Sequence, residues 1–133
     1  MRCSASLLGA LFAASALSCE AHPHEFGHEH PDTPSGATCP PTSTLTWENF
    51  GRPFVETHCT TCHSVHRSGD ARQGALPGTD FDTAENVRAW ADPIDRHAAA
   101  GSLNVNRSMP TTSPVPSDEE RRRLGEWLAC GAP

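Results

Sequence analysis

Residues 59–63 read Cys-Thr-Thr-Cys-His, and the other predictions are built outward from this stretch. The pattern C-x-x-C-H is the attachment signature of c-type haem, in which each thiol adds to a vinyl group and forms a thioether. On a helix, Cys59, Cys62 and His63 share one face, because positions i, i+3 and i+4 are neighbours. The pattern therefore predicts one covalent haem c, with Cys59 and Cys62 as its thioethers and His63 as the proximal iron ligand.

Two other origins of the motif are less favoured. With 6 Cys and 8 His in 133 residues, a chance match has a probability of roughly 0.016. A thioredoxin-like dithiol needs a strand–helix–strand context, and no such pattern surrounds residues 59–63. Haem attachment is the favoured interpretation.

Length and charge limit the function classes. A chain of 133 residues suits one domain. The formal net charge is −6 and all ten basic residues are arginine, so no basic patch for nucleic acid is expected. No apolar run of about 20 residues follows the N-terminal region, so we expect no membrane-spanning helix in the mature protein.

Residues 1–18 are predicted to be a signal peptide. Arg2 supplies the positive charge, and residues 7–17 form an apolar stretch too short to span a membrane. Residues 16–19 (Ala-Leu-Ser-Cys) resemble a bacterial lipoprotein signal with Cys19 as the lipidated residue. Ordinary cleavage after Ala16 is the alternative, but it leaves an odd number of cysteines. Either route predicts export, and lipidation places the protein on the periplasmic side of the cell envelope.

Residues 19–44 are rich in His and Pro and poor in apolar side chains. Such a segment cannot bury enough surface to offset its ordering entropy, so we expect a disordered tether before a folded domain at residues 45–133. The tract contains four closely spaced histidines. A loose metal-capture site is possible there, but a merely polar tether is favoured. The four residues are His22, His24, His28 and His30.

Two cysteines of the mature chain remain after Cys59 and Cys62 are assigned to the haem and Cys19 to the lipid. Cys39 and Cys130 flank the expected folded region, and a disulfide between them would pin the tether to the last helix. In the loop-entropy model such a long loop is worth about 4–5 kcal/mol. The alternative is two unpaired thiols.

The folded region is predicted to be all-α, since no strand-type alternation occurs in it. A first helix should run from Trp47 to the haem motif, with Thr46 as its N-cap. Pro53 should kink it or delay its start. The segment from His66 to Thr79 is predicted to be a loop because it is rich in Gly and Pro.

Three further helices are predicted from capping patterns. One begins with Asp82 as its cap and ends near Ala91, and the next starts at Asp92-Pro93 and ends near Ala100. The last begins with the capping box at Ser117 and ends near Gly131. Its apolar face consists of Leu124, Trp127 and Leu128.

The basic run on the last helix, Arg121 to Arg123, is expected to be a solvated face. A docking patch, or a hydrogen bond to a haem propionate, is the alternative.

Met109 is the predicted distal iron ligand. It is the only methionine after the signal peptide, it lies in a polar loop, and Pro110 biases its backbone to an extended form. A methionine that fills a gap in the core is the alternative. His97, His66 and His58 are rival ligands.

The region from Trp47 to Pro133 resembles a class I cytochrome c domain. Gly51 stands eight residues before the haem motif, where this family places a small residue for the close crossing of its first and last helices. Leu124-x-x-Trp127 resembles the pair that packs at that crossing. The resemblance implies three main helices plus a short extra helix around a covalently bound haem.

Two loop features extend the resemblance. Pro77 is similar to the family proline whose carbonyl orients the proximal imidazole of His63. Met109-Pro110 resembles the distal-ligand loop. The implied function is a one-electron carrier, not an enzyme, that is monomeric and docks on redox proteins of the envelope by charge complementarity. Alternatives are a haem-based sensor with a displaceable sixth ligand, and an electron-entry subunit of a larger oxidoreductase.

Overall fold

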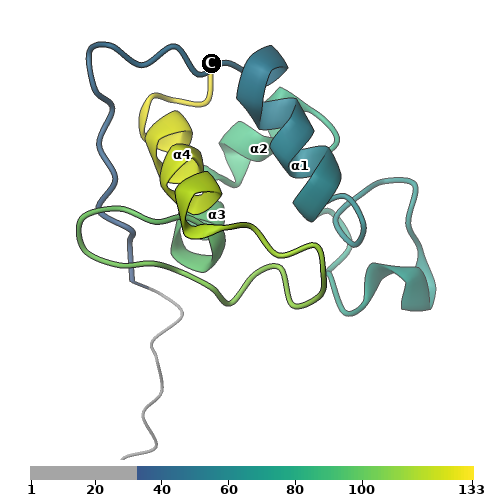
Figure 1. Ribbon diagram of the computed structural model, residues 1–133. Coiled ribbons are helices and arrows are strands. Elements are labelled where there is room, and N and C mark those ends of the chain that lie inside the picture. The colour runs from purple at the N-terminus through teal and green to yellow at the C-terminus, as the bar shows by residue number, and fades with distance from the viewer. Residues whose placement is uncertain (1–32) are drawn as a thin grey trace, which may run out of the picture.

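The computed structural model describes residues 33–133, and within that range the chain is helical and contains no strand. The all-α prediction is confirmed at this level. Helices α3 and α4 lie against each other, and α1 crosses near α4, with long loops below (Figure 1). The elements are a π-helical turn η1 (Trp47–Gly51), α1 (Arg52–His58), a 3₁₀ turn η2 (Gly69–Arg72), α2 (Ala84–Ala89), α3 (Ala91–Ala98) and α4 (Asp118–Ala129).

The first helix begins where the sequence predicts. The Thr46 hydroxyl accepts from the backbone N–H of Asn49, and the Asn49 side chain bonds back to the Thr46 N–H. The helix then changes type: η1 ends at Gly51 and α1 begins at Arg52, with Pro53 in its first turn. Proline is tolerated at this position because its missing N–H has no partner in a first turn. The kink or delayed start that was predicted at Pro53 therefore takes the form of a change from a π-helical turn to an α-helix.

Helix α2 begins one residue after its predicted start, and α3 begins two residues before the predicted first helical residue, Pro93. Thr83, not Asp82, caps α2, and its side chain accepts from the Asn86 N–H. The carboxylate of Asp82 instead bonds residues that follow the C-x-x-C-H motif. Helix α3 begins at Ala91, so Asp92 lies inside its first turn rather than at its cap. Position 82 is therefore used for a long-range contact that overrides its capping preference.

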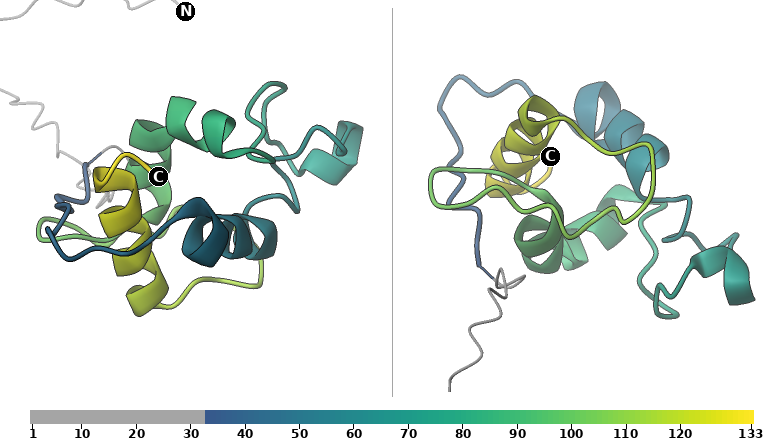
Figure 2. Two further views of the ribbon diagram at one scale, coloured as in Figure 1. Left: turned by 90° about the horizontal axis from the view of Figure 1, so that it is seen from above. Right: turned by 60° about the horizontal axis from the view of Figure 1, so that its bottom comes forward.

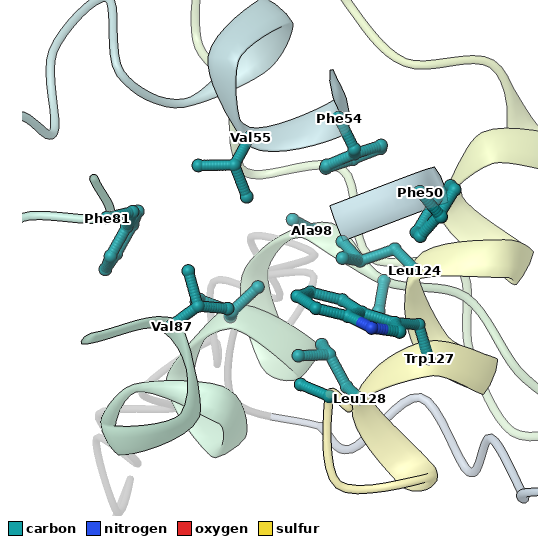
Figure 3. Packing of buried hydrophobic residues seen from close by; sticks show 12 residues of the cluster. Phe50, Phe54, Val55, Phe81, Val87, Ala98, Leu124, Trp127 and Leu128 are labelled. Atoms are coloured by element: carbon teal, nitrogen blue, oxygen red, sulfur yellow. The ribbon is translucent and has the colours of Figure 1, made fainter. Parts of the chain in front are cut away.

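The last helix matches its prediction closely. Ser117 and Glu120 form the capping box of α4, and Leu124, Trp127 and Leu128 are buried. Trp127 is fully buried and lies in the middle of the core, with side chains from the other helices around it (Figure 3). The core residues are Phe50, Phe54, Val55, Phe81, Val87, Ile94, Ala98, Ala99, Leu124, Trp127, Leu128 and Ala132.

The crossing of η1 over α4 requires a glycine. A Cβ atom at Gly51 would overlap the six-membered ring of Trp127. The ring of Phe50 packs edge-on to Trp127 with centroids 6.1 Å apart, and Trp47 stacks on it at 6.2 Å. The small residue expected at this position therefore lies directly at the helix contact.

Residues 33–44 form a strap along the outer side of α4 (Figures 1 and 2). Ser35 is fully buried and bonds the Asp95 carboxylate through both its N–H and its hydroxyl. Cys39 forms a disulfide with Cys130, across 91 residues of sequence. The prediction of a disordered tether is therefore wrong for residues 33–44, because hydrogen bonds and a covalent link replace the missing apolar surface.

The signal peptide, Cys19 and the four histidines of residues 22–30 lie outside the described residues. Within residues 33–133, no helix is both long enough and apolar enough to cross a membrane.

Candidate functional site

One cavity contains the C-x-x-C-H motif. It opens between the end of α1, the motif, the turn after η2, and the loop that precedes α4. Its volume is about 170 Å³, which is smaller than the roughly 300–1,000 Å³ of pockets that enclose small-molecule ligands, so a cofactor-sized group would extend into its open mouth. The residues around it are Phe54, His58, Cys59, Thr61, Cys62, His63, Arg72–Ala75, Ala98 and Met109–Pro114.

His63 is held from two sides. Its Nδ1 lies 2.9 Å from the Thr79 carbonyl oxygen, and its ring stacks on Phe81 with centroids 4.7 Å apart and planes 16° apart. A carbonyl only accepts, so Nδ1 carries the proton and Nε2 keeps its lone pair. This is the tautomer that a metal ligand requires.

The orienting carbonyl is not that of Pro77, as the resemblance implied, but that of Thr79 two residues later. The Thr79 hydroxyl donates to the Leu76 carbonyl and lies 3.2 Å from His63 Nδ1. Pro77 therefore belongs to the same turn without providing the contact.

Arg72 organises the loop that carries Thr79. Its guanidinium is buried, forms an ion pair with Asp80 at 2.7 Å, and donates to four backbone carbonyls. Because one buried side chain satisfies so many acceptors, this Gly-rich loop acquires a defined shape. The four carbonyls belong to Ser64, Arg67, Ala75 and Leu76.

Asp82 ties the motif to the start of α2. Its carboxylate accepts from the Ser64 hydroxyl at 2.6 Å and from the Val65 N–H at 2.9 Å. Burial by itself raises the pKa of Asp82, but these hydrogen bonds outweigh it and hold the pKa below its usual value. The Phe81 N–H also donates to the His63 carbonyl. The residues after the motif are therefore bonded to residues 79–82.

Cys59 and Cys62 are both free thiols at the cavity wall. The pKa of the Cys59 thiol is raised to about 12, mainly by burial, with Arg121 opposing the shift and the nearby Cys62 adding to it. A thiol with such a pKa stays protonated near neutral pH and is a poor nucleophile. The high pKa argues against a dithiol redox centre. It is compatible with two thiols that become bonded to a cofactor.

Met109 lies at the same cavity, as predicted. It is 40% exposed. Its N–H donates to the His97 carbonyl at 2.9 Å, and its carbonyl accepts from Arg121 at 2.8 Å. Both backbone polar groups are thus bonded, and the following residue is Pro110. The Met109 backbone is fixed by neighbours on α3 and α4.

Of the rival histidines, only His58 lines the cavity. It is buried, its Nδ1 lies 2.8 Å from the Pro114 carbonyl, and its Nε2 lies 3.7 Å from Glu120. His97 is bonded to the Ser108 hydroxyl, and His66 is exposed. His58 therefore joins α1 to the loop that contains Met109.

Arg121 is a buried residue near the site whose burial sequence reasoning missed. The expected solvated face holds for Arg122 and Arg123, which are exposed, but Arg121 is fully buried. The i, i+3 spacing from Arg121 to Leu124 was the available signal, because it places Arg121 on the apolar face of α4.

None of the exposed residues that line the cavity is charged. Arg72 is the charged residue among those around the cavity, and it is buried. The exposed ones are uncharged, namely Thr61, Gln73, Gly74, Met109, Thr111, Thr112, Ser113 and Pro114. The exposed residues that line the cavity therefore offer no charge for the expected charge complementarity.

No cluster of three or more His, Cys, Asp or Glu side chains in residues 33–133 is arranged to hold a metal ion directly. The sulfur and imidazole donors at the cavity are the two thiols, the Met109 thioether and the imidazoles of His63 and His58. This set suits a group that bonds covalently to sulfur and brings its own metal. Comparison with known proteins finds no matching protein family, curated protein or solved structure.

Proposed function

We propose that the protein is a monohaem c-type cytochrome that carries single electrons in the bacterial cell envelope. One observation carries the proposal: Cys59, Cys62, His63 and Met109 all border one cavity, and the His63 tautomer leaves Nε2 available. Cys59 and Cys62 would form the thioethers, and His63 and Met109 would be the iron ligands. The haem would supply the one-electron redox change, as cofactors do.

The rest of the site supports this role. The Thr79 carbonyl and the Phe81 ring orient His63, and such outer partners raise the basicity of a metal-binding imidazole. Phe54 and Ala98 contribute apolar wall, which excludes water. The close packing of Gly51 on Trp127 agrees with the class I cytochrome c fold that the motif pattern resembles.

The cellular setting is part of the proposal. Export by residues 1–18 suits haem attachment outside the cytoplasm, and lipid at Cys19 would hold the domain at the membrane. Redox proteins of the envelope would be the partners.

The visible spectrum of the mature protein, made with a haem-attachment system, tests the proposal. We expect a covalent c-type spectrum that is lost in the C59A/C62A variant. The oxidised protein should show the weak Met–iron charge-transfer band, and M109A should lack it. A mature protein without haem would refute the proposal.

A second candidate is a sensor in which Met109 leaves the iron and a small ligand enters. The 40% exposure of Met109 is the observation that favours it. Rapid binding of carbon monoxide by the reduced protein would support the sensor, whereas slow or absent binding would support the electron carrier.

A further inference from the structure

Arg121 is an unusual buried cation. It lies in the first half of α4, its side chain is 0% exposed, and no carboxylate in residues 33–133 forms an ion pair with it. Asp118, on the same helix, is paired with Arg107 instead. A buried charge without a counter-ion is costly unless hydrogen bonds satisfy it.

Hydrogen bonds satisfy only one of its nitrogen atoms. The two N–H groups of Nη1 are shared among three carbonyl oxygens, those of Ala98, Asn106 and Met109, each 2.8 Å from the nitrogen. Nε and Nη2 are buried and have no partner among the residues that the structure describes. The hydrogen bonds of the Arg121 guanidinium itself therefore do not explain why an arginine occupies this buried position.

The location of the three carbonyl groups that Arg121 contacts gives a better explanation of its burial. Ala98 ends α3, and Asn106 and Met109 belong to the loop that leads to α4. The Met109 N–H is already bonded to the His97 carbonyl. Arg121 thus closes the second of two backbone contacts that fix Met109 at the cavity wall.

We propose that Arg121 is a positioning residue that keeps the Met109 thioether on the iron and external ligands off it. This inference rests on the proposed function, in which Met109 is the distal ligand. Without the guanidinium, the Met109 carbonyl would lose its partner from α4, and the loop could move away from the cavity. The site would then accept a competing ligand more readily.

The test compares haem-loaded wild type with R121M and R122M. Arg122 is the matched control because it is the next residue of the same helix and is exposed. Imidazole is the competing ligand, and the Met–iron charge-transfer band is the second readout. We expect R121M to bind imidazole about tenfold more tightly than wild type, as the loss of a charge-assisted hydrogen bond implies. Its band should be weakened, and R122M should match wild type.

A lysine pair keeps the test decisive if R121M does not fold. Lysine retains the positive charge and has three N–H donors on one nitrogen, but its side chain has a different length and lacks the planar guanidinium. R121K should bind imidazole with an affinity between those of wild type and M109A, and R122K should match wild type. Wild-type behaviour in R121K and R121M, or in R121K alone if R121M does not fold, would overturn the positioning role and leave the cytochrome proposal intact. Absence of haem from wild type would instead refute the proposed function.

Discussion

Asp82 accepts a hydrogen bond from the Ser64 hydroxyl at 2.6 Å, across 18 residues of sequence. Its second oxygen accepts from the Val65 N–H. The contact joins the residue after His63 to the start of α2, so the orientation of the motif depends on a carboxylate outside it.

D82N should destabilise the protein by about 1 kcal/mol at pH 7, since a half-exposed carboxylate is partly screened. Because hydrogen bonds hold the pKa of Asp82 below its unfolded value, this contribution is complete above about pH 4 and is lost as the pH falls through the folded pKa. Denaturant unfolding between pH 6 and pH 3 measures it. D70N, at an exposed site, is the control, and a gap between wild type and D82N that does not narrow as the pH falls would contradict the prediction.

Cys59 should resist alkylation in the haem-free, folded protein. With its pKa raised to about 12 by burial, the thiolate fraction at pH 8 is about 10⁻⁴, and the thiolate is the reactive form. Mass spectrometry after timed iodoacetamide treatment should find Cys62 modified first, with circular dichroism as the check on folding. Equal rates at the two cysteines in a folded chain would show the prediction to be wrong.

The Cys39–Cys130 disulfide should contribute about 2–4 kcal/mol to stability, because it closes a long loop of the unfolded chain. The C39A/C130A variant should unfold at lower denaturant concentration than oxidised wild type. Wild type treated with reductant under the same conditions is the control and should match the variant. No difference between oxidised wild type and the variant would rule out this contribution.

G51A should cost about 1–3 kcal/mol, because an added methyl group overpacks the contact with the Trp127 ring. A double-mutant cycle with W127L identifies the cause: the cost of G51A should shrink when the ring is absent. E48A, an exposed change in the same turn, should be nearly neutral. An unchanged cost in the W127L background would place the effect elsewhere.

Charge added at the cavity rim should control the rate of electron exchange with an anionic probe. T112K should accelerate oxidation by ferricyanide about threefold at low salt, with the gain lost above 0.2 M salt, because the exposed residues that line the native cavity are uncharged. T112E should slow it. Thr42 is exposed and lies away from the cavity lining, so T42K should have little effect, and equal effects at both positions would mean that electrons do not pass at this rim.

Local patterns predicted much of the fold. The N-cap at Thr46, the capping box at Ser117 and the buried stripe of α4 all follow from short-range sequence signals. These are features of a single helix, so neighbouring side chains determine them.

Contacts between distant segments were the ones that sequence reasoning missed. Burial of Arg121 depends on carbonyls at positions 98, 106 and 109, and burial of Ser35 depends on Asp95. A polar residue in such a place has the same local signature as a solvated one. The partner of His63 was missed by two residues because the turn around Arg72 decides which carbonyl faces the ring.

The disulfide also has a mechanical consequence. A pull along the chain from its N-terminal side would reach Cys39 before any residue of the motif, and the bond to Cys130 would transfer part of that load to the end of α4. The hydrogen bonds at Thr33 and Ser35 would yield before it, because they are non-covalent attachments upstream of that bond. An anchored domain could therefore be dragged or reoriented while the segment from Trp47 to His63 stays unstretched.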